Sequence, residues 1–157
     1  MKHINVSVFV PHAGCPHQCS FCDQRTISGT VEAPTPEEVT QTCQAMLERS
    51  GSLESAEIAF FGGSFTAIDR DYMIELLSSA QEFIGENGFK GIRISTRPDA
   101  VDGEICDILE KYHVTAVELG AQSTNDKVLA MNRRGHTRED IFRSARLLKE
   151  RGFELGL

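Results

Sequence analysis

Three closely spaced cysteines are the residues of this chain best suited to chemistry. Cys15, Cys19 and Cys22 lie within a run of eight residues and are three of the five cysteines in the sequence. Thiols packed this closely, in a chain without secretory features, are typical of metal or cluster ligands rather than disulfides. Three ligands are one fewer than a closed structural zinc site requires. An iron–sulfur cubane held by three thiolates would instead leave one iron open to another molecule.

The same cysteines allow two simpler interpretations. A zinc site could recruit His12 or His17 as its fourth ligand, because zinc and iron both accept thiolates. An iron–sulfur centre could also serve only to carry electrons. The remaining cysteines, Cys43 and Cys106, fall on the apolar faces of expected helices, so we predict that they are core residues.

Other candidate residues follow short apolar stretches that have the pattern of buried strands. These segments are Gly62-Gly63-Ser64-Phe65-Thr66, Ser95-Thr96-Arg97-Pro98-Asp99 and Gly120-Ala121-Gln122-Ser123. Functional groups gather at the carboxyl ends of parallel strands. We therefore expect these segments to share one rim with the cysteines, which follow the first strand. Paired glycines there either form an ordinary turn or let a ligand approach the backbone closely.

Apolar periodicity predicts strands and helices in alternation. The expected strands are 4–10, 58–61, 91–96, 115–120 and 153–157. The expected helices run from Thr35 to Ser50, from the cap Asp69 to Ile84, over 105–112, briefly near 124–131, and from the cap Thr137 to Gly152. Thr35, Pro36 and Glu38 form the signature of a capped helix start.

This alternation predicts an α/β fold with a parallel sheet and right-handed crossovers. A doubly wound sheet and the wall of a barrel are the two architectures that fit. A parallel strand needs neighbours and helices around it. Since the pattern stops within a fifth strand, we expect residues 1–157 to be the N-terminal part of a longer domain, truncated in that strand. Within the fourth strand, Glu118 should pair with Arg93 or Arg97, because an unpaired buried carboxylate is costly.

Composition narrows the class of protein further. The 16 Lys and Arg residues against 23 Asp and Glu residues give a net charge of −7, a poor footprint for nucleic-acid binding. RNA remains a candidate partner that this charge does not support. No apolar run approaches the length of a membrane span, and the chain begins directly with a strand pattern. Free thiols without an export signal indicate the cytoplasm.

These motifs resemble those of the radical S-adenosylmethionine (SAM) superfamily. The Cys15-x-x-x-Cys19-x-x-Cys22 spacing, with Phe21 before the last cysteine, is similar to the family signature, and Gly62 to Thr66 resembles its glycine-rich SAM-binding motif. Segments 95–99, 118–123 and 134–137 more narrowly resemble the radical-SAM domain of the Elongator catalytic subunit and its bacterial relatives. Oxygen-independent coproporphyrinogen oxidases show looser similarity.

The resemblance implies a partial TIM-like barrel, usually of six strand–helix units, with about four units and the start of a fifth strand present. It implies a [4Fe-4S] cluster on the three cysteines and SAM bound at the open iron. Reductive cleavage of SAM would yield a 5′-deoxyadenosyl radical that acts on an unknown substrate, with electrons from a flavodoxin or ferredoxin. The residues that the resemblance assigns to SAM binding are Phe21, Gly62, Gly63, Ser64, Ser95, Gln122 and Arg134.

The sequence departs from both the Elongator subunit and the porphyrinogen oxidases, so neither substrate is assigned to this chain. Ser64 and Ser95 stand where porphyrinogen oxidases have acidic residues, and the Elongator subunit has much longer spacings between its cysteines. Arg134 belongs to a basic run that is either an exposed loop or, as the resemblance implies, a clamp for the SAM carboxylate. Transfer RNA modification and porphyrinogen oxidation therefore stay alternatives to an unassigned radical reaction, as does a non-catalytic zinc or iron–sulfur module.

Overall fold

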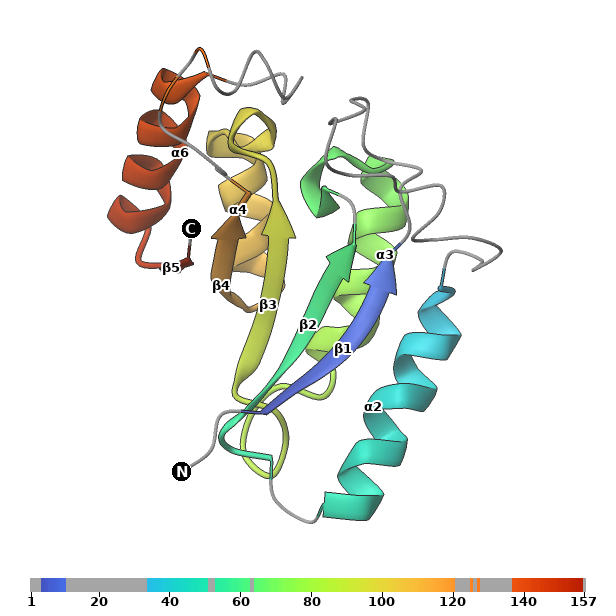
Figure 1. Cartoon of the computed structure of the whole chain (residues 1–157). Helices are drawn as coiled ribbons and strands as arrows, with labels where there is room; N and C mark the ends of the chain where they lie inside the picture. Colours follow the sequence, from blue (N-terminus) through green and yellow to red (C-terminus); the bar gives the residue numbers. More distant parts are fainter. Residues whose placement is uncertain are drawn as a thin grey trace.

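Figure 1 shows the computed structural model of the chain, in which strands run side by side and helices flank them. The structure describes residues 4–10, 34–50, 53–62, 64–120, 125, 127 and 137–156. The strands in these ranges are β1 (Ile4–Val10), β2 (Ala56–Gly62), β3 (Gly91–Thr96), β4 (Val114–Leu119) and β5 (Glu154–Gly156). The helices are α2 (Pro36–Ser50), α3 (Arg70–Gln81), α4 (Gly103–Lys111) and α6 (Arg138–Glu150), with short 3-10 turns η2 (Phe65–Ala67) and η3 (Pro98–Ala100).

The described strands form one parallel sheet in the chain order β1-β2-β3-β4-β5. Parallel neighbours are joined by crossovers that are almost always right-handed. When each new strand is added on the same side, the crossover helices all fall on one face of the sheet. A doubly wound sheet would instead reverse its strand order. The order observed is that of a TIM-like barrel wall, which confirms the expected fold class.

The strand register separates two faces of the sheet. Val6 lies beside Ile58 and Ile92, and Val8 lies beside Phe60. These side chains are all buried, and they form one core cluster with apolar residues of the helices, among them Val39, Leu76, Leu77, Leu109 and Leu148. The alternate positions of the strands point to the other side, which we call the open face. The sheet thus has one side packed against helices and one side that carries polar and aromatic groups.

Arg93 is the centre of an ion-pair cluster on the open face. Its Nε lies 2.9 Å from Glu57 Oε2, and its terminal nitrogens lie 3.1 Å from Glu118 Oε1 and 3.2 Å from Glu154 Oε1. Burial alone would lower the pKa of Arg93, but hydrogen bonds to Glu57 and Glu154 and the charge of Glu118 raise it. The expected partner of Glu118 is therefore Arg93. Glu57 is fully buried, and the sequence did not predict its part in this cluster.

Helix starts follow the sequence closely. Thr35 Oγ1 accepts from the Glu38 N–H at 3.1 Å, and Glu38 Oε2 accepts from the Thr35 N–H at 3.1 Å, so the predicted capping box is confirmed. A second box joins Thr137 and Asp140 at the start of α6.

Helix α4 was expected over 105–112 and runs from Gly103 to Lys111. The end of α3 differs further from its prediction. The apolar stripe of α3 was expected to reach Ile84, but the helix ends at Gln81. The chain turns back there, with Gly85 and Asn87 at positive φ, and Ile84 forms a bridge with Phe89. The spacing of apolar residues does not reveal this turn, because Ile84 still packs against the core.

The short helix expected near residues 124–131 lies outside the described residues, apart from Asn125 and Lys127. Across the described ranges, the structure contains no helix of the length and apolarity that a membrane crossing requires.

We predict that Arg93→Met destabilises the fold by about 3 kcal/mol, because it removes a cation from a buried carboxylate. Arg70→Met is the matched control, since Arg70 and its partner Glu104 are 45% and 71% exposed; such pairs contribute at most about 1 kcal/mol. Urea denaturation measures both. Equal midpoints for the two variants would show that the Arg93 cluster does not stabilise the sheet.

Candidate functional site at the carboxyl ends of the strands

Strands β1 and β2 end together, and this brings the glycine motif to the start of the cysteine segment. Val10, the last residue of β1, is the register partner of Gly62. Gly62 has a φ of +122°, and a Cβ there would lie 2.3 Å from the Val10 carbonyl oxygen. Only glycine fits this position without displacing backbone. Cys15, which lies outside the described residues, follows Val10 by five residues in the sequence.

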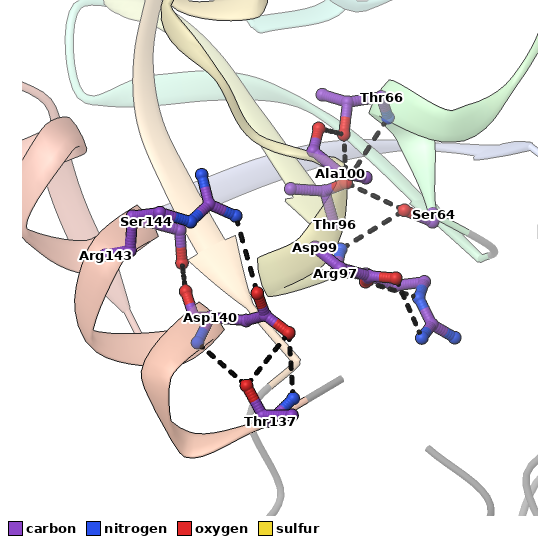
Figure 2. A network of polar contacts seen from close by, with 10 residues as sticks. All are labelled: Ser64, Thr66, Thr96, Arg97, Asp99, Ala100, Thr137, Asp140, Arg143 and Ser144. Carbon is purple, nitrogen blue, oxygen red and sulfur yellow. Dashed lines mark hydrogen bonds and ion pairs between the residues drawn. The ribbon is translucent and has the colours of Figure 1, made fainter. Parts of the chain in front are cut away.

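A cluster of buried hydroxyl groups joins the loop after β2 to the loop after β3 (Figure 2). Ser64 Oγ lies 2.8 Å from Thr96 Oγ1, which also contacts Thr66 Oγ1. Ser64 Oγ accepts from the Arg97 N–H at 3.1 Å, and Thr66 Oγ1 donates to the Ala100 carbonyl at 2.7 Å. Because these side chains are at most 8% exposed, the bonds form away from water. They hold the two loops at a fixed separation.

Arg97 and Asp99 form a charged pair at the same rim. Arg97 is only 5% exposed, and its Nε lies 2.9 Å from Asp99 Oδ1. A second bond joins Arg97 Nη2 to Asp99 Oδ2 at 3.3 Å, so the contact is bidentate. The pair holds a guanidinium inside the loop after β3.

Helix α6 packs against the turn η3 in this loop (Figure 2). Arg143 Nη1 donates to the Val101 carbonyl at 3.1 Å, and Ser144 Oγ donates to the Asp140 carbonyl at 2.7 Å. The chain therefore returns to the rim as it enters α6 at Thr137, three residues after Arg134.

Three of the predicted site residues fall within the described ranges. Gly62 ends β2, Ser64 is 3% exposed within the hydroxyl cluster, and Ser95 lies on the open face with partial exposure. The remaining predicted residues lie outside the described residues, and their placement stays a prediction: Cys15, Cys19, Phe21, Cys22, Gly63, Gln122 and Arg134.

Sequence reasoning placed Thr66 and Thr96 within candidate segments but did not single out either one as a site residue. Both follow strand patterns and carry hydroxyl groups in otherwise apolar surroundings, and this is the signal that could have identified them. A buried hydroxyl group needs a partner, so two such groups on adjacent loops favour a mutual contact.

The described cysteines lack the character of ligands. Burial raises the pKa of Cys43 to about 12, and burial is also the main cause that raises the pKa of Cys106. Both groups therefore stay protonated near neutral pH, whereas metals bind the thiolate. Within the described part of the chain, no group of three or more His, Cys, Asp or Glu residues is arranged to hold a metal ion.

We predict that Gly62→Ala costs clearly more stability than Gly85→Ala. Both glycines have positive φ, +122° and +131°, so both substitutions introduce backbone strain of about 1–3 kcal/mol. Only at Gly62 would the added Cβ also meet backbone, since nothing lies within 4 Å of a Cβ at Gly85. Thermal unfolding of the two variants compares them, and equal losses would argue against a forced approach of β2 to Val10.

Ser64→Ala should destabilise the fold by about 1–3 kcal/mol, because the buried Arg97 N–H loses its acceptor. Ser79→Ala is the control, since the Ser79 hydroxyl group makes only a solvent-exposed bond to the Glu75 carbonyl; we expect a change within about 0.5 kcal/mol. Chemical denaturation would contradict the role of the hydroxyl cluster if both variants unfolded like the parent protein.

Known proteins match this chain along nearly its whole length. It is 30% identical to a methylthiotransferase-like protein, MJ0865, of Methanocaldococcus jannaschii, over 92% of this chain and 32% of that protein. It is 25% identical to the tRNA uridine(34) acetyltransferase of Methanocaldococcus infernus, over 96% of this chain and 35% of that protein. The chain thus spans about a third of the length of these relatives.

A solved structure of Methanocaldococcus infernus Elp3 with an N-terminal deletion superimposes with a TM-score of 0.66, at 22% identity, over 97% of this chain and 36% of that chain. This likeness supports the barrel-wall fold. The sequence profile of the radical SAM superfamily matches residues 9–156. That family uses a [4Fe-4S] cluster and SAM, in agreement with the expected cofactors. Because this profile match extends over most of the chain, the chain belongs to the radical SAM superfamily.

Proposed function

We propose that this chain forms the part of a radical SAM enzyme that holds the [4Fe-4S] cluster and SAM, and that the enzyme acts on an unassigned substrate. The observation that carries the proposal is the pairing of Val10 with Gly62, because Val10 ends the strand that precedes the cysteine segment in the sequence and Gly62 begins the glycine motif. When bound, the cluster and SAM supply reductive cleavage of SAM to a 5′-deoxyadenosyl radical. The protein binds, positions and shields them.

The residues at the rim fit this role to different degrees. At Gly62 the Val10 carbonyl and the Phe9 ring occupy the position of a Cβ, so the glycine allows the close pairing of β2 with β1 that forms this corner. Ser95 lies partly exposed on the open face, where a bound molecule could reach it. The Ser64 hydroxyl group is occupied by Thr96 and Arg97, so its role is to position the loop. The residues proposed for the cluster and for the remaining SAM contacts are Cys15, Cys19, Cys22, Phe21, Gly63, Gln122 and Arg134.

Residues 1–157 would serve as the N-terminal part of a larger core domain. The described sheet supports this, because β1 and β5 each have a paired strand on one side only, whereas a closed barrel has no edge strands. The greater length of the relatives agrees with it. A one-electron donor of the flavodoxin or ferredoxin type and a cytoplasmic location complete the proposal.

Transfer RNA modification is the second candidate function. It is favoured by the similarity to tRNA uridine(34) acetyltransferases, which extends over 96% of this chain. The net charge of −7 gives this chain no electrostatic preference for RNA. RNA contacts would therefore come from other parts of the enzyme. Nucleoside analysis of transfer RNA from cells lacking the protein would reveal a missing modification if this candidate is right.

Anaerobic reconstitution with iron and sulfide tests the leading proposal. We predict that the reduced, reconstituted enzyme releases 5′-deoxyadenosine from SAM, and that Cys19→Ala abolishes both the brown chromophore and this release, because the cluster loses a ligand. Cys43→Ala and Cys106→Ala are matched controls that should retain the cluster, since both thiols are buried and protonated. Chromatography of the product and iron analysis measure the two properties.

A colourless protein with bound zinc would overturn the proposal in favour of a structural module. A brown protein that leaves SAM intact would favour an electron carrier. Loss of the cluster in Cys43→Ala or Cys106→Ala would contradict the assignment of the ligands.

A further inference from the structure

A row of five residues crosses the open face at one level, directly beneath the glycine corner. Phe9 pairs with Phe61, and Glu118 pairs with both Ser95 and Gly156. Phe61 follows Phe60, the register partner of Ile94, so Ser95 lies at the level of Phe61. We call Phe9, Phe61, Ser95, Glu118 and Gly156 the rim row. Its members come from β1 to β5 in order.

The first half of the rim row is aromatic. The rings of Phe9 and Phe61 lie 5.2 Å apart at an interplanar angle of 65°, an edge-to-face contact. This contact holds the Phe61 ring in a defined orientation while 41% of the residue stays exposed. In the described residues, the other large hydrophobic side chain with comparable exposure is Phe142 on α6. Phe61 therefore presents an oriented apolar surface one residue before Gly62.

The second half of the rim row is polar and negative. Arg93 holds Glu118 through Oε1 at 3.1 Å, and within the described residues the structure records no hydrogen bond to Glu118 Oε2. The Glu118 side chain is 50% exposed. Arg93 is shared among three carboxylates, Glu57, Glu118 and Glu154, so it does not neutralise them all. Glu118 thus offers a hydrogen-bond acceptor that is fixed in place and carries residual negative charge.

The distance between the two halves of the rim row determines the size of a ligand group that could contact both. Adjacent strands lie about 4.8 Å apart, so the backbones of Phe61 and Glu118 are about 10 Å apart across Ser95, and their side chains project from the same face. A flat ring stacked on Phe61 would extend over Ser95, and an amino group on the ring would reach Glu118. The absence of a side chain at Gly156 leaves the far side of Glu118 clear, since a Cβ there would lie 3.1 Å from Glu118 Cγ.

We propose that the rim row binds the substrate of this enzyme through a flat, N–H-bearing ring of the nucleobase type, stacked on Phe61 and donating to Glu118. The inference rests on the proposed function, because the cluster and SAM would lie at the same rim. The adenine of SAM has the same chemistry, so a competition experiment must separate the two sources. A carboxylate next to an aromatic surface favours an amino-bearing ring over an anionic or purely aliphatic group.

The test uses cytidine as the probe, with N4,N4-dimethylcytidine as the analogue that lacks the N–H donor. Binding to the reconstituted protein is followed by NMR titration, both without SAM and in saturating SAM. We expect cytidine to bind about tenfold more tightly than the dimethyl analogue. Phe61→Leu should weaken cytidine about tenfold, because stacking is lost while apolar bulk remains. Glu118→Gln should reduce the preference for cytidine over the analogue.

Phe142→Leu and Glu104→Gln are matched controls, because they remove an exposed ring and an exposed carboxylate elsewhere on the surface. Both should bind cytidine like the parent protein, and thermal unfolding of all variants verifies that they are folded. No cytidine binding, or equal binding of the two nucleosides, overturns the proposal. Cytidine binding that SAM displaces also overturns it, since the row would then serve the cofactor.

Failure of the proposed function gives a different result. If cytidine binds in this pattern but SAM is not cleaved, the ring site stands and the radical reaction does not. If 5′-deoxyadenosine forms but cytidine does not bind, the radical reaction stands and the ring site is wrong.

Discussion

Parallel pairing of the strands in chain order is the constraint on which the rest of this structure depends. It places the helices on one face and forms a single core there, around residues such as Ile58, Ile92 and Leu109. In the described ranges, the same pairing leaves the other face without helices. Polar groups on that face must therefore satisfy one another, and the Arg93 cluster does so by linking β2, β3, β4 and β5 with one guanidinium. The register that builds the core thus also decides which side chains are available for chemistry.

The same constraint aligns the strand ends. Since β1 and β2 finish at the paired residues Val10 and Gly62, the cysteine segment and the glycine motif start from one corner. Hydroxyl groups of Ser64 and Thr96 then tie the next loop to this corner. A cofactor site at this corner would be positioned by the sheet and by these loop-to-loop bonds. Preorganisation of this kind reduces the entropic cost of ordering the protein when a ligand binds.

Much of the fold could be predicted from the sequence, for identifiable reasons. Helix starts such as Thr35 and Thr137 are set by local capping, and the strands by short apolar runs, so both are visible in a few residues. The end of α3 was not predictable from spacing, because Ile84 keeps its apolar contact after the helix has ended. Glu57 was missed because its partners Arg93 and Thr115 are remote in sequence, and only the register brings them within reach. Local signals therefore predict elements, whereas non-local pairs need the structure.

The candidate site divides in the same way. Gly62 was predictable because a paired-glycine motif is a local signal, and the structure supplies the physical reason in the approach to Val10. The role of Ser64 was read from its position in a motif, yet its hydroxyl group is engaged by Arg97 and Thr96, contacts that depend on the distance between two loops. The rim row has no local signature at all, since its members are spread from Phe9 to Gly156. With the proposed roles, contiguous motifs would encode cofactor binding, and residues that meet only across the strands would select the substrate. This division explains why the family can be identified from the sequence, whereas a proposal about the substrate requires the three-dimensional structure.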